Sequence, residues 1–72
     1  MAETNGLRVN VRTDATRENV VEVVLEHVNA EGGVRLINRL NAYPADPWHR
    51  KQAIEDGRFR AGLGGFGFVV ED

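Results

Sequence analysis

The sequence predicts one small α+β domain, in the order β-α-α-α-β-β, whose three-stranded antiparallel sheet packs on helices. Three observations lead to this fold class: alternating residues near the N-terminus, apolar residues at helical spacing in the middle, and two alternating stretches around a Gly-Gly pair near the C-terminus. A chain of 72 residues has room for one core. We expect a flexible N-terminal tail over residues 1–6 and a single domain over residues 7–72.

The first strand is predicted over residues 7–12, because apolar and polar residues alternate there with the period of a strand. The apolar set consists of Leu7, Val9 and Val11, and the polar set of Arg8, Asn10 and Arg12. We expect the apolar face to lie on the core and the polar face in water.

A helix is predicted over residues 15–29. Possible N-cap oxygens belong to Thr13, Asp14 and Thr16, and the apolar side chains that follow share one arc of a helical wheel: Val20, Val21, Val24, Leu25 and Val28. The opposite side would carry a solvated acidic stripe of Glu18, Glu22 and Glu26. A strand would place Val20, Glu22, Val24 and Glu26 on one face, and we take it as the poorer interpretation, although β-branched valines are unfavourable in helices. Gly32 and Gly33 would end the helix.

A second helix is predicted over residues 34–42. Helical spacing groups the apolar side chains of Leu36, Ile37, Leu40 and Tyr43. A strand would instead turn Asn38 toward the core. Pro44 would end the helix, because proline cannot donate the next backbone hydrogen bond.

A third helix is predicted over residues 47–56. Asp46 supplies the N-cap, Pro47 occupies the first helical position, and Gly57 is a plausible residue to follow the last turn. The apolar residues of this segment form no continuous stripe. We therefore expect the helix to lie on the surface, with Trp48 as its anchor.

A β-hairpin is predicted at the C-terminus, with strands over residues 58–63 and 66–71 and a turn at Gly64 and Gly65. In this register Ala61 pairs with Phe68, and the large apolar residues of both strands share one face. The opposite face of the sheet would be a basic patch with Arg8, Asn10, Arg12, Arg58 and Arg60. Either strand 7–12 or strand 66–71 would lie at an edge with unpaired backbone groups.

No catalytic, cofactor-binding or metal-binding residues are predicted, and we expect no enzyme activity. The chain contains neither cysteine nor serine, which excludes those nucleophiles, disulfides and Cys-ligated zinc. His27 and His49 lack the spacing of a metal-binding pair. Residues 62–67 match the string G-x-G-x-x-G, but too few residues follow to form the helix that would receive a phosphate.

The charge is small overall and unevenly distributed. A net charge of -2 argues against a general nucleic-acid binder. Residues 1–33 carry three arginines against six acidic residues, whereas residues 34–60 carry six basic residues against three acidic ones. The chain shows no signal-peptide pattern and no apolar run of about 20 residues. Together with the lack of cysteine, this predicts a cytoplasmic protein with no membrane partner.

These features predict a small regulatory or inhibitory module that docks on a larger protein through a charged face. The candidate partner-binding residues are Glu18, Glu22, Glu26, Arg8, Arg12, Arg58 and Arg60. An alternative is a DNA-binding protein of winged helix-turn-helix type, which would use the helix 47–56 and the hairpin 58–71 through His49, Arg50, Lys51, Gln52, Arg58 and Arg60. A further alternative is a structural subunit that forms a homodimer through a sheet edge, or through Trp48 and Tyr43 if they are exposed.

Overall fold

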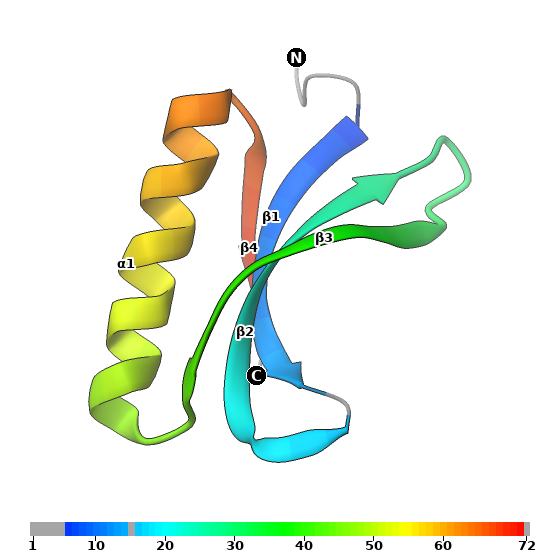
Figure 1. Ribbon diagram of the computed structural model, residues 1–72. Helices are drawn as coiled ribbons and strands as arrows, with labels where there is room; N and C mark the ends of the chain where they lie inside the picture. The colour runs from blue at the N-terminus through cyan, green and yellow to red at the C-terminus, as the bar shows by residue number, and fades with distance from the viewer. Residues whose placement is uncertain (1–5, 15, 72) are drawn as a thin grey trace.

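The fold is one α-helix on a four-stranded mixed sheet (Figure 1). The computed structural model describes residues 6–14 and 16–71, apart from the side chain of Glu18. The elements are β1 (Leu7–Asp14), β2 (Arg17–Val28), β3 (Val34–Pro44), α1 (Pro47–Gly64) and β4 (Gly67–Val70). The sheet order is β3-β2-β1-β4, with antiparallel pairs except for β1 and β4, which are parallel.

The α+β class is therefore confirmed, but the predicted order β-α-α-α-β-β and the three-stranded sheet are wrong. The described part of the chain has the order β-β-β-α-β. Of the predicted tail, residues 1–5 lie outside the described part of the chain. Strand 7–12 is confirmed and extends to Asp14. Of the two strands expected to provide an edge, β1 lies inside the sheet and β4 lies at one of its edges.

The predicted helix 15–29 is wrong, because this segment contains β2, the central long strand of the sheet. Glu22, Val24 and Glu26 do share one face, as the rejected strand interpretation required. The glutamates can share this face with Val24 because each one lies opposite an arginine of β1: Arg8 pairs with Glu26 and Arg12 with Glu22. The β-branched valines of this segment suit a strand better than a helix.

The predicted helix 34–42 is wrong as well, because the segment forms the edge strand β3. Its pairing with β2 shifts twice, between Val23 and Val24 and again between Leu25 and Glu26. At each shift β3 carries one extra residue, Leu40 and Ile37 respectively. Each bulge breaks the period of two, and this break made the apolar spacing resemble a helix.

The predicted start of the helix at residue 47 is confirmed, but its predicted end is wrong. Asp46 is the N-cap and accepts a hydrogen bond from the His49 backbone N–H, and Pro47 begins the helix. The helix continues through Gly57 to Gly64 and ends at Gly65, whose φ of 70° is left-handed. Residues 58–63 are therefore helical and the predicted hairpin is wrong, but the strand predicted over 66–71 is present as β4 (Gly67–Val70). Ala61 does not pair with Phe68 but is buried where α1 packs on the sheet.

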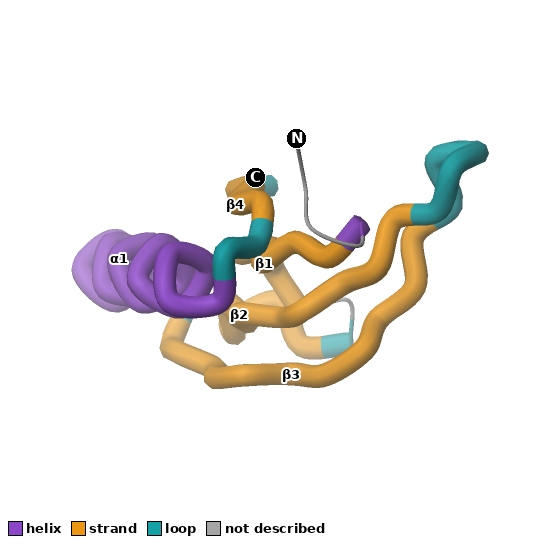
Figure 2. Tube along the Cα trace, turned by 90° about the horizontal axis from the view of Figure 1, so that it is seen from above, coloured by secondary structure: helices purple, strands orange, loops and turns teal. Residues whose placement is uncertain are grey.

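The core lies between α1 and one face of the sheet. Valines of β1 and β2 meet small residues of the helix; the buried set is Val9, Val11, Val21, Val23, Ala53, Gly57 and Ala61. The small helical residues let the helix backbone approach the sheet closely. Trp48 does not anchor the helix, because 65% of the residue is exposed. Seen from above, the far end of the β2–β3 hairpin projects away from α1 (Figure 2).

Candidate functional site

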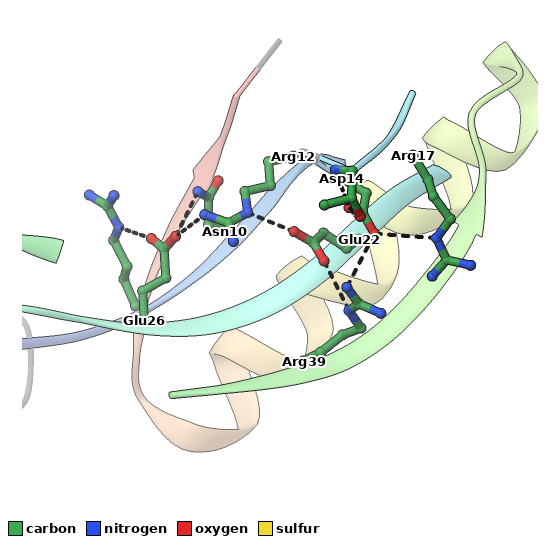
Figure 3. Close-up of polar contacts among 9 residues, drawn as sticks. Asn10, Arg12, Asp14, Arg17, Glu22, Glu26 and Arg39 are labelled. Atoms are coloured by element: carbon green, nitrogen blue, oxygen red, sulfur yellow. Dashed lines mark hydrogen bonds and ion pairs between the residues drawn. The ribbon is translucent and has the colours of Figure 1, made fainter. Parts of the chain in front are cut away.

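The sheet face away from α1 carries an ion-pair network that links β1, β2 and β3 (Figure 3). At one end, Glu26 is the common acceptor. Arg8 Nε donates to its Oε1 at 2.9 Å, and Oε2 accepts from Asn10 Nδ2 at 3.2 Å and from Arg12 Nη1 at 3.1 Å. Glu26 is 1% exposed, so these donors replace its water shell.

The network continues along β2 to Glu22. Arg12 Nε donates to Glu22 Oε2 at 2.8 Å, and Arg39 Nε donates to Glu22 Oε1 at 2.9 Å. The hydrogen bond with Glu22 raises the pKa of Arg12 above its usual value. Glu22 is 3% exposed. Two strands that flank β2 thus each supply an arginine to the same buried carboxylate.

Asp14 closes the other end of the network. Its Oδ1 accepts hydrogen bonds from the backbone N–H and the hydroxyl of Thr16, each at 2.8 Å, and these bonds lower the pKa of Asp14 below its usual range. Its Oδ2 lies 3.1 Å from Arg39 Nη2 and 3.7 Å from Arg17 Nε. Asp14 therefore ties the β1–β2 turn to the edge strand β3.

This geometry corrects the expected charged faces. Glu22 and Glu26 do not form a solvated stripe on a helix, and the side chain of Glu18 lies outside the described part of the structure. Arg8 and Arg12 do lie on the open sheet face, but they neutralise those glutamates. Glu22 and Glu26 of the expected acidic stripe and Arg8, Asn10 and Arg12 of the expected basic patch are thus brought together in one network.

Arg58 and Arg60 lie on α1 and not on the sheet. Arg60 Nε donates to Asp56 Oδ1 at 2.8 Å, and Asp56 Oδ2 accepts from the Tyr43 hydroxyl at 2.7 Å. The guanidinium carbon of Arg58 lies 5.7 Å from the centre of the Phe68 ring. Tyr43 is half-buried where its hydroxyl contacts Asp56, so it does not form an exposed surface with Trp48.

The other candidate DNA-binding residues, His49, Arg50, Lys51 and Gln52, occupy the first turns of α1. His49 Nδ1 lies 2.6 Å from Asp46 Oδ2, a contact within the N-cap. Residues 58–71 comprise the end of α1, its connection and β4, so no wing follows the helix. The winged helix-turn-helix arrangement is therefore wrong for this fold.

The outward side of α1 carries a surface that the sequence interpretation missed. Trp48 and Phe59 are each 65% exposed and Leu63 is 73% exposed. Residues 48, 52, 55, 59 and 63 follow the three- and four-residue steps that keep side chains on one side of a helix. We call Trp48, Phe59 and Leu63 the apolar stripe. An 18-residue helix with small residues at 53, 57 and 61 was the signal that could have revealed it.

One flank of α1 forms a shallow groove of about 390 Å³, lined by Pro47, Arg50, Lys51, Ile54, Glu55 and Arg58, and the Arg58 guanidinium reaches over the Phe68 ring of β4. Across residues 6–14 and 16–71, no group of three or more acidic, histidine or cysteine residues could hold a metal ion. The described helix is also not long and apolar enough to cross a membrane.

Comparison with known proteins shows no matching family model, no matching curated protein and no matching solved structure.

Proposed function

We propose that this chain is a small protein-binding module that docks on a larger protein through the apolar stripe of α1. The supporting observation is the distribution of side-chain size around the helix, which is the reverse of the usual one. Its buried residues are Ala53, Gly57 and Ala61, whereas its largest apolar side chains face water. The fold uses the small residues for packing, and the large ones are left for a partner.

The energetics favour this use of the stripe. Burying a large apolar side chain in an interface contributes about 1.5–3 kcal/mol. Trp is enriched among the few residues that dominate protein–protein binding, and an amphipathic helix in a partner's groove is a common recognition mode. Trp48, Phe59 and Leu63 span most of α1, which suits a groove that follows the helix axis.

The test compares two variants that each lose three exposed apolar side chains. The first replaces Trp48, Phe59 and Leu63 with serine, and the control replaces the exposed β3 residues Val34, Leu36 and Ile37 with serine. Each protein is immobilised, and proteins bound from native lysate are quantified by mass spectrometry. A stripe partner is a protein that wild type and the β3 control retain and the stripe variant loses.

The same partner should then bind purified wild type directly and shift the fluorescence of Trp48, the only tryptophan, to shorter wavelength. Both variants should keep the wild-type circular dichroism spectrum, since none of the replaced residues belongs to the buried core. If every protein retained by wild type is retained equally by the stripe variant, docking through this surface is wrong.

A further inference from the structure

The two edges of the sheet differ in their capacity to accept another strand. The β3 edge carries bulges at Ile37 and Leu40 and charged side chains at Arg35 and Arg39, devices that protect edges from pairing. The β4 edge, Gly67–Val70, is paired with β1 in an unbroken register and contains no charged residue and no proline. Within the described chain, β4 is therefore the edge that lacks protection against pairing with another strand.

The backbone of β4 shows which groups point outward. The Glu71 N–H donates to the Val11 carbonyl at 2.8 Å. Because strand residues alternate in direction, the N–H and C=O of Val69 also face β1. The N–H and C=O of Phe68 and Val70 then face away from the sheet. Among residues 6–14 and 16–71, none of these outward groups takes part in a backbone hydrogen bond.

The charged residues near the β4 edge indicate which kind of segment would bind there. Five arginines are paired with carboxylates of this chain: Arg8, Arg12, Arg17, Arg39 and Arg60. In the described structure no carboxylate lies within 4.0 Å of the charged groups of Lys51 and Arg58. Both residues line the groove of α1, and Arg58 lies over the Phe68 ring of β4. Glu55 is the one acidic residue in that lining. The flank is therefore basic.

We infer that β4 binds an extended acidic segment of another protein as an added strand, next to the basic flank of α1. Backbone hydrogen bonds to Phe68 and Val70 would hold the segment, and its carboxylates would face Lys51 and Arg58. Apolar residues at the alternate positions would lie beside Val69 on the other face. A second copy of this chain fits less well, because a two-fold axis at β4 would bring the Lys51 and Arg58 flank toward its own equivalent.

This surface is separate from the apolar stripe, and its test uses a defined probe. The probe is a fluorescent octapeptide of alternating glutamate and valine, compared by anisotropy with the same peptide carrying lysine for glutamate. The acidic peptide should bind about tenfold more tightly, and raised salt should weaken it. In amide hydrogen exchange, the peptide should protect the N–H groups of Phe68 and Val70, which exchange faster than those of Val69 and Glu71 in the free protein.

Two variants test the two parts of the site separately. Val70→Pro removes an outward N–H without removing a hydrogen bond to β1, and should weaken peptide binding about tenfold. The double variant Lys51→Glu, Arg58→Glu should reverse the charge preference, whereas Arg35→Glu, on the other sheet edge, should leave it unchanged. Amide spectra of each variant show whether it folds.

The inference is overturned if both peptides bind equally, if neither binds, or if a folded Val70→Pro variant binds the acidic peptide as wild type does. It is also overturned if sedimentation equilibrium shows a dimer that Val70→Pro dissociates, because a second copy would then occupy the edge. None of these results bears on the apolar stripe, whose lysate comparison uses different residues.

Discussion

Adding one methyl group to α1 should have opposite effects on the two sides of the helix. Gly57 lies where the helix backbone approaches the sheet: a Cβ added there would lie 2.8 Å from Val11 Cγ2 and 2.9 Å from Phe68 Cε1. At Gly62, on the exposed side of the same helix, a Cβ would meet no atom within 4 Å. The substitution is identical, and only the surroundings differ.

The magnitude follows from two terms. Alanine in place of glycine inside a helix stabilises it by up to about 1 kcal/mol, and both variants gain this term. Forcing a methyl group into a packed core costs about 1–3 kcal/mol, and only Gly57→Ala incurs this cost, because its new Cβ would meet the fully buried Val11. Gly62→Ala should therefore be more stable than Gly57→Ala by about 1–3 kcal/mol.

Urea unfolding followed by circular dichroism measures this difference directly, and thermal unfolding should separate the two midpoints by about 4–8 °C for each kcal/mol in a domain of this size. Gly62→Ala should also unfold at a higher urea concentration than wild type. If Gly57→Ala proves as stable as Gly62→Ala, the close approach of α1 to the sheet is wrong, and with it the packing reason for the small residues on this side.

Two further predictions concern buried polar groups. Glu26→Gln should lower the free energy of unfolding by about 3 kcal/mol, the lower end of the range for removing one member of a buried ion pair, since its arginine donors can still reach water; urea unfolding should show no such loss for Glu31→Gln in the exposed β2–β3 turn. Tyr43 is the only tyrosine. Its pKa is raised above the usual value of 10.0, mainly by burial and secondly by its hydrogen bond to Asp56. Ultraviolet titration should show ionisation above that pH in the folded protein. Because the folded pKa is raised, stability from this contact is present below pH 10 and is lost as pH rises through the folded pKa. A midpoint at or below the ordinary value would contradict the buried contact.

Local signals predicted the parts of the fold that depend on neighbouring residues. The alternation of Leu7 to Arg12 predicted β1 with its polar face away from the helix, because side-chain direction in a strand depends only on position along it. Asp46 and Pro47 predicted the start of α1, because an N-cap bond closes within three residues. These signals act over one turn or one strand, and no distant residue is needed to interpret them.

The candidate surfaces could not be predicted in the same way. Glu22 and Glu26 look solvated in any local interpretation, and only the cross-strand partners supplied by β1 and β3 allow their burial. The apolar stripe was hidden because the sequence interpretation ended the helix at residue 56, which assigned Phe59 and Leu63 to a strand. Gly57 supported that ending, since glycine often follows a helix.

Three features of the fold could be predicted from local sequence patterns: the α+β class, the polar face of the first strand, and the residue at which the helix begins. That residues 17–28 and 34–44 are strands became clear only from the folded structure. Their apolar spacing fits either a helix or a strand until the bulges of β3 and the arginines opposite Glu22 and Glu26 are in place. The folded structure also explains Gly57: a Cβ there would lie 2.8 Å from Val11 Cγ2 and 2.9 Å from Phe68 Cε1, so glycine is favoured at this position despite its cost of about 1 kcal/mol inside a helix. Each of these features depends on contacts between residues far apart in the chain, and a local sequence pattern carries no information about such contacts.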